Sequence, residues 1–137
     1  MERMHYVGFD LHKKTIEYCV KRADGTVVAK GRLQANRSAL TEWAGAQAVP
    51  WTGAMEATLF TGWVYDHFKS LNAEQELKVA HPAMVRAITA AKKKSDPIDA
   101  GKLADLLRCN LLPECYMAPA PIRELRRVLR FRNLLVR

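Results

Sequence analysis

Cysteine is scarce in this 137-residue chain, and long apolar runs are lacking. The three cysteines are an odd number without metal-ligand spacing, which argues against a disulfide scaffold or a zinc ribbon. No stretch approaches the roughly 18 uninterrupted apolar residues of a membrane span. The first residues hold neither an apolar core nor a small-residue cleavage site, so we expect no secretory signal and a cytoplasmic protein.

Acidic residues are also few, because 14 Asp and Glu stand against 22 Lys and Arg, for a net charge of +8. Most of the basic surplus lies in residues 92–137, which carry 11 basic and 5 acidic side chains. Such clustering indicates a polyanionic partner, and the alternative is a basic domain without one. Hydrophobic residues make up 49% of the chain, which is enough for a core and excludes a disordered tail.

Apolar runs and period-two alternation predict five short strands. The first three follow one another through short connections, and the turn signal Asp24-Gly25 precedes the third, so they form an antiparallel meander. The last two are separated by helical periodicity, which indicates parallel crossovers and a mixed sheet with helices on both faces. Right-handed crossovers place the fourth strand beside the first. The predicted strands are residues 6–11, 16–21, 26–33, 52–57 and 76–80.

Helical periodicity and capping residues predict five helices. Asn36 or Ser38 caps the first, and Ser95 or Asp96 caps the fourth, with Pro97 at its first position. Three prolines then mark a linker before a basic amphipathic helix. The helices are expected from residue 36 or 38 to residue 44, then over residues 60–71, 82–88, 97–107 and 122–137.

Four acidic residues are expected to meet at one place in this fold. Asp10 ends the first strand and Glu56 ends the fourth, so neighbouring strands bring both carboxylates to one edge of the sheet. Asp96 and Asp99 lie three residues apart at the start of a helix and so share one face. Clustered carboxylates repel unless cations neutralise them, and Mg²⁺ prefers such ligands. Two such ions can activate one oxygen and stabilise the leaving oxygen of a phosphodiester.

Each acid also has a structural alternative. Asp10 could pair with Lys13 or Lys14 at the end of its strand. Asp96 could simply cap its helix, and an acid at position 99 is favoured by the helix dipole in any case. Glu56 lies in an apolar stretch, where burying an unpaired charge is expensive, and this favours a functional role. His12, next but one to Asp10, is a further candidate metal ligand or base.

Three short blocks of the chain resemble the acidic blocks of DEDD transposases, the insertion-sequence enzymes that include the pilin-gene invertases. The blocks are residues 8–14 (GFDLHKK), 54–58 (AMEAT) and 94–100 (KSDPIDA), and the resemblance covers about residues 5–110. It implies an RNase H-like domain of the RuvC type, with a mixed five-stranded sheet flanked by helices. We therefore expect a catalytic domain over residues 1–112, and a linker with the start of a helical segment over residues 113–137.

The resemblance also implies a metal-dependent DNA transposase or recombinase. Two Mg²⁺ ions, with Mn²⁺ as a substitute, would be held by four catalytic residues. Family members are thought to be guided by a structured RNA and carry a second domain with a serine nucleophile. We therefore expect the chain to be part of a longer protein or a truncation, and to be incomplete alone for strand transfer. The catalytic metal ligands would be Asp10, Glu56, Asp96 and Asp99.

The expected partners are DNA, a guide RNA and further copies of the chain in a homodimer or higher oligomer, and no membrane. Seven basic residues are candidate contacts to the nucleic-acid backbone, and a solvated basic face is the alternative. Two other functions compete: a non-catalytic nucleic-acid-binding and dimerisation fragment, and an actin-like sugar kinase. The kinase alternative is disfavoured because this chain has no glycine-rich phosphate loop after its first predicted strand. The candidate contacts are Lys92, Lys93, Lys94, Arg123, Arg126, Arg127 and Arg130.

Overall fold

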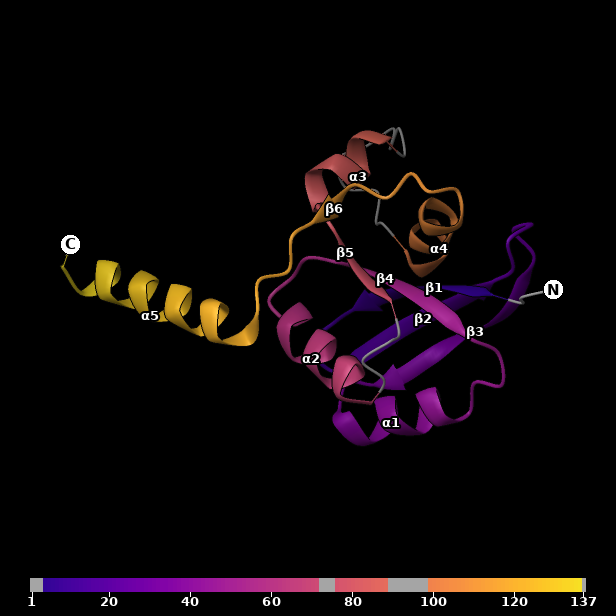
Figure 1. Ribbon diagram of the computed structural model, residues 1–137, viewed down its shortest axis with the longest axis horizontal. Helices are drawn as coiled ribbons and strands as arrows, with labels where there is room; N and C mark the ends of the chain where they lie inside the picture. Colours follow the sequence, from indigo (N-terminus) through magenta and orange to yellow (C-terminus); the bar gives the residue numbers. More distant parts are fainter. Residues whose placement is uncertain (1–3, 72–75, 89–98, 137) are drawn as a thin grey trace.

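A mixed sheet with helices on both faces forms the body of the protein in a computed structural model, which describes residues 4–71, 76–88 and 99–136 (Figure 1). The described strands are β1 (His5–Leu11), β2 (Thr15–Lys21), β3 (Val27–Gln34), β4 (Trp51–Glu56), β5 (Leu77–Ala80) and β6 (Glu114–Cys115). The described helices are α1 (Arg37–Gly45), α2 (Thr61–Leu71), α3 (Pro82–Ile88), α4 (Ala100–Arg108) and α5 (Ala120–Val136).

The strand order of the sheet is β3-β2-β1-β4-β5-β6. Strand β1 is antiparallel to β2 and parallel to β4, which confirms the predicted neighbours. The Asp24-Gly25 turn is confirmed as well, because Gly25 has a φ of 91° and the Thr26 amide donates to Asp24 Oδ1 at 2.8 Å. Strand β6 is an addition to the five predicted strands. It pairs antiparallel with β5 inside the stretch expected to be a linker, where its two residues are too few to give a pattern.

Helices α1 and α2 cover one face of the sheet around Phe9 of β1. The Phe9 ring lies 5.3 Å from the ring of Trp43 on α1 and 5.2 Å from that of Phe68 on α2. Trp51 of β4 completes the cluster at 5.8 Å from Phe9. Rings in edge-to-face or tilted contact at these distances add stability beyond the burial of their area. These two tryptophans therefore belong to the hydrophobic core.

Helices α3 and α4 cover the opposite face, where Val85 and Leu103 pack over Ala54 and Ala80. Helix α4 lies directly on β1 at Gly8. A Cβ atom built on Gly8 would lie 1.9 Å from the Ala100 carbonyl oxygen, which leaves no room for any side chain. The first turn of α4 therefore sits against the strand that carries Asp10.

The helix starts test two of the capping predictions. Asn36 caps α1 as expected, because its Oδ1 accepts from the Ala39 amide at 2.8 Å. The expectation that Ser95 or Asp96 caps the fourth helix is wrong, because α4 begins at Ala100 and its N-cap is Asp99. Aspartate is a residue type that caps helices well, and the contact of Ala100 with Gly8 fits the start at Asp99.

Helix α5 leaves the body of the protein beside the first turns of α2, where Arg123 pairs with Asp66, and extends away from the sheet (Figure 1). Its apolar side chains are exposed from Ile122 to Leu135. Among the described helices none has the length and apolar character needed to cross a membrane. The exposed apolar residues of α5 are Ile122, Leu125, Val128, Leu129, Phe131, Leu134 and Leu135.

Candidate active site

Asp10 and Glu56 lie at the same end and on the same face of two neighbouring parallel strands. The register pairs Gly8 with Ala54 and then Phe9 with Met55, so Asp10 and Glu56 follow one step further along. Because successive strand residues alternate between faces, Asp10 shares the α4 face with Gly8, and Glu56 shares it with Ala54. The predicted neighbourhood of these two carboxylates is therefore present in the fold.

The electrostatics of Asp10 indicate a cluster of negative charge. Burial raises the pKa of the Asp10 carboxyl, the nearby His12 partly offsets this, and the charges of Glu17 and Asp99 raise it further. Burial also raises the pKa of Glu56, which Arg86 lowers and the charge of Asp10 raises again. Negative charges on β2 and at the start of α4 thus act on Asp10, and its ionised form is disfavoured without a cation.

Asp99 reaches this cluster as the N-cap of α4 rather than from inside the helix. Its Oδ1 accepts from the Lys102 amide at 2.8 Å, so the carboxylate has a structural task beside any other. The local alternative of helix capping, weighed for Asp96, is the arrangement found at Asp99. Asp96, Lys92, Lys93 and Lys94 lie outside the described residues.

The partners of Asp10 and Glu56 differ from those expected. Asp10 Oδ2 lies 3.0 Å from His12 Nε2, so its described partner is His12 in place of the lysines considered from the sequence. Glu56 Oε1 lies 3.6 Å from Arg86 Nη2, so this acid in an apolar stretch has a cationic neighbour on α3. Arg86 could not be linked to Glu56 from the sequence, because the contact joins a strand end to a helix thirty residues later.

Glu17 is a candidate that the sequence reasoning missed. It stands opposite Asp10 in the register of β1 and β2, and potential ligand atoms of Asp10, His12 and Glu17 lie within 4.8 Å of one another. Glu17 also accepts from Arg32 Nη2 at 2.7 Å. The short connection between the two strands was the signal that could have found it, since it fixes which residues face each other.

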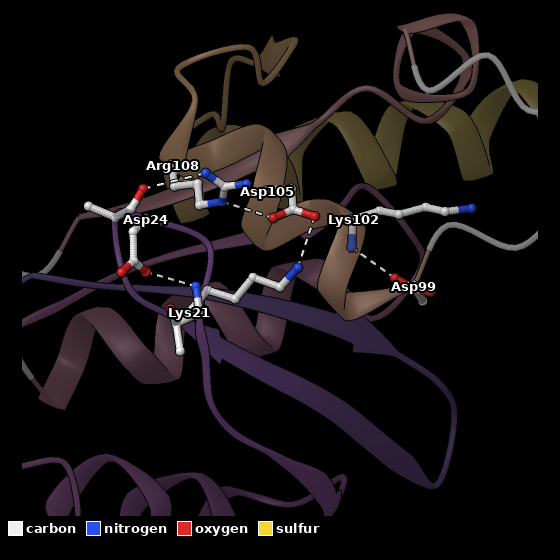
Figure 2. A network of polar contacts seen from close by, with 8 residues as sticks. Lys21, Asp24, Asp99, Lys102, Asp105 and Arg108 are labelled. Carbon is white, nitrogen blue, oxygen red and sulfur yellow. Dashed lines mark hydrogen bonds and ion pairs between the residues drawn. The ribbon is translucent and has the colours of Figure 1, made fainter.

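A network of ion pairs fastens α4 to the β2–β3 hairpin (Figure 2). Lys21 Nζ donates to Asp105 Oδ2 at 2.9 Å, and Arg108 Nε donates to Asp105 Oδ1 at 2.9 Å. Arg108 also reaches the Ala23 carbonyl oxygen in the turn, at 3.4 Å. Because Asp99 caps the same helix, this network and the Gly8 contact together hold the Asp99 carboxylate at a place from which its charge raises the pKa of Asp10.

The candidate nucleic-acid contacts on α5 are not equivalent. Arg123 forms an ion pair with Asp66 of α2 and donates to the Ala118 carbonyl oxygen, so it anchors the start of the helix. Arg127 is paired with Glu124 on its own helix. Arg126 and Arg130 form no ion pair with any residue in the described ranges.

The mixed sheet, its helical layers and the acids at the ends of β1 and β4 agree with an RNase H-like domain of a nucleic-acid-processing enzyme. Residues 7–137 match the profile of the IS110-type DEDD transposases, which is described as a transposase, and the chain belongs to this family. This confirms the resemblance found in the sequence. A search of curated proteins found no match. Family membership implies DNA binding, DNA cleavage and the use of a divalent metal.

Proposed function

We propose that Asp10, Glu56, Asp96 and Asp99 hold Mg²⁺, with two ions as the full complement and Mn²⁺ as a substitute, at the DNA-cleaving centre. The observation that carries the proposal is the position of Asp10 beside Glu56 at the ends of neighbouring strands. The charges of Glu17 and Asp99 raise the pKa of Asp10, and the charge of Asp10 raises the pKa of Glu56. A bound cation would neutralise the repulsion between these carboxylates and so stabilise their ionised forms.

The donor set fits a hard divalent ion. Carboxylate oxygens are the ligands that Mg²⁺ takes, and Asp10, His12 and Glu17 already bring potential ligand atoms within 4.8 Å of one another. Glu17 is therefore a further acid that could contact an ion bound at Asp10. When bound, the ion would lower the pKa of a coordinated water and stabilise the leaving oxygen of the phosphodiester.

The residues around the acids orient them for this task. His12 contacts Oδ2 of Asp10, Arg86 lies beside Oε1 of Glu56, and the Lys102 amide holds Oδ1 of Asp99. Each carboxylate is thus fixed by one partner through one oxygen. Carboxylates held in this way lose little conformational freedom on binding an ion or a substrate.

Asp99 gives a prediction that separates capping from catalysis. Asparagine caps helices about as well as aspartate, so Asp99→Asn should keep the melting temperature within about 2 °C of wild type while cleavage falls about 100-fold. Asp99→Ala should lose both the helix cap and the cleavage activity, with about 1 kcal/mol less stability. Thermal melts and a cleavage assay on the two variants measure this. Full activity in Asp99→Asn would leave Asp99 a capping residue only.

The proposed activity is tested with the whole chain on labelled branched and linear DNA. Cleavage that requires Mg²⁺ or Mn²⁺ and stops in EDTA is the expected result. Binding without cleavage in either metal would instead favour the non-catalytic fragment, in which strand transfer waits for the serine-containing domain. In this proposal residues 1–112 form the catalytic unit, and residues 113–137 add β6 to its edge and begin the helical segment.

We infer that the apolar face of α5 packs against a second copy of the chain. Ile122, Leu125 and Leu129 are exposed at the alternating three- and four-residue spacing of a two-stranded coiled coil. The family resemblance adds a structured guide RNA as a further proposed partner. Light scattering during size exclusion, with and without added RNA, tests both: a dimer mass supports the first, and a larger complex with RNA supports the second.

A further inference from the structure

A groove of about 800 Å³ lies between α2 and α5, and its lining is rich in arginine. Two of these arginines are occupied, because Arg123 pairs with Asp66 and Arg127 pairs with Glu124. The other three have no acidic partner in the part of the chain that the structure describes. The groove therefore keeps a surplus of positive charge, carried by Arg37, Arg126 and Arg130.

Two of these charges follow one another along α5, and the third lies on the opposite wall beside an aromatic ring. Arg126 and Arg130 are one helical turn apart on α5, a rise of about 6 Å along the axis. On the other wall the Arg37 guanidinium lies over the half-buried Trp63 ring, with its Cζ 5.7 Å from the centroid. Grooves that bind single-stranded nucleic acids combine these two features: cations that follow the backbone and flat groups on which bases stack.

The groove is lined in part by the connection that follows Glu56. Thr58 and Leu59 line its rim and come directly after the end of β4, two and three residues beyond Glu56. This connection is held in place, since the Thr61 hydroxyl donates to the Glu56 carbonyl oxygen at 2.9 Å and accepts from the Thr58 amide at 2.8 Å. Leu59 is 97% exposed at the rim. The groove and Glu56 therefore lie at the same end of β4, with the groove beside α2 and the acids on the face that α4 covers.

We propose that this groove binds a single nucleic-acid strand, with Arg126 and Arg130 on successive phosphates and the Trp63–Arg37 pair against a base. The inference rests on the proposed function for the nature of its ligand. It adds a second wall, from α1 and α2, to the arginines of α5. It also separates the arginines that bind the strand from Arg123, which ties α5 to α2, and from Arg127, whose partner Glu124 lies on its own helix.

The test measures fluorescence anisotropy of labelled 20-nucleotide oligo(dT) and oligo(rU) with the whole chain in EDTA, over a series of salt concentrations. The double variant Arg126→Gln, Arg130→Gln should bind about tenfold more weakly at low salt, and its salt slope should fall by about 1.4, the value for two phosphates. The matched control Arg22→Gln, Arg132→Gln loses the same charge outside the groove and should change affinity less than about twofold. Both doubles replace exposed side chains, and circular dichroism checks their folding.

Equal losses in the two doubles would overturn the proposal, as would a wild-type chain that binds neither oligonucleotide. Binding of the DNA or of the RNA alone supports it and identifies the source of the strand. Tryptophan emission gives a second readout, because the quenching caused by oligo(dT) should disappear in Trp63→Phe while the buried Trp43 and Trp51 remain. No divalent ion is present, so failure here leaves the cleavage test standing, and failed cleavage with normal strand binding overturns only the proposed function.

Discussion

Asp10→Asn is expected to reduce metal-dependent DNA cleavage by about 10²–10³-fold or more and, at the same time, to stabilise the metal-free protein near neutral pH. The loss of activity follows from removing the most central of the proposed ligands. The gain in stability follows from the raised pKa of Asp10, because burial and the neighbouring acids make its charged form unfavourable. Asparagine keeps the shape of the side chain and its contact with His12 while removing the charge.

The sign of the pH dependence follows from linkage. A carboxyl whose pKa is raised by folding costs the native state stability at pH values above that pKa, and the cost disappears as pH falls toward the ordinary value. The melting temperature of Asp10→Asn in EDTA should therefore exceed that of wild type by about 2 °C or more at pH 7, and the difference should shrink on acidification. Thermal melts across this pH range measure the effect.

Asp24→Asn is the matched control, because it makes the same chemical change where the pKa shift has the opposite direction. Hydrogen bonds from Thr26 lower the pKa of Asp24, so its replacement should give no gain in stability and should leave cleavage unchanged. An Asp10→Asn variant that cleaves DNA normally would exclude Asp10 from the centre. An Asp10→Asn variant that melts below wild type at pH 7 would show that the charge of Asp10 does not destabilise the metal-free fold.

Gly8→Ala should cause the largest loss of stability of any single methyl group added to this fold. The new Cβ would lie 1.9 Å from the Ala100 carbonyl oxygen and 2.8 Å from the Ala104 amide nitrogen, so the backbone of α4 must move off β1. Overpacking against backbone costs about 3 kcal/mol, which corresponds to about 10 °C in the melting temperature. Because α4 carries Asp99, metal affinity should fall as well.

Gly45→Ala provides the comparison, since nothing lies within 4 Å of the added Cβ at the end of α1. Alanine has the higher helix propensity, so this variant should melt at or slightly above the wild-type temperature. Thermal and urea unfolding of both variants give the two numbers. If Gly8→Ala unfolds within about 2 °C of wild type, helix α4 does not pack on β1 as described.

The sheet could be predicted from the sequence because its signals are local. Period-two alternation marked β2, Asp24-Gly25 marked the hairpin, and the handedness of crossovers placed β4 beside β1. The same rule brings Asp10 and Glu56 to one edge of the sheet from the sequence alone. Local signals could not decide the start of α4, because Ser95, Asp96 and Asp99 are all residue types that cap helices. The structure has the cap at Asp99, where Ala100 contacts Gly8.

The remainder of the site depends on contacts between distant parts of the chain. Glu17 enters through the β1–β2 register, and Arg86 enters from α3 after the chain has crossed the sheet. The anchoring role of Arg123 depends on Asp66, which is 57 residues away. The sequence pattern indicates the strand or helix on which each of these residues lies. Their partners are defined only by the packing of the sheet and helices.

The central claim is that Asp10 and Glu56 act together on a divalent ion, and isothermal titration of Mn²⁺ into the metal-free chain tests it most directly. The wild-type chain should bind with a measurable heat at pH 7.5 and more weakly at pH 5, because protons compete for carboxyls of raised pKa. The double variant Asp10→Asn, Glu56→Gln should show no binding at either pH. Unchanged binding in the double variant would contradict the account.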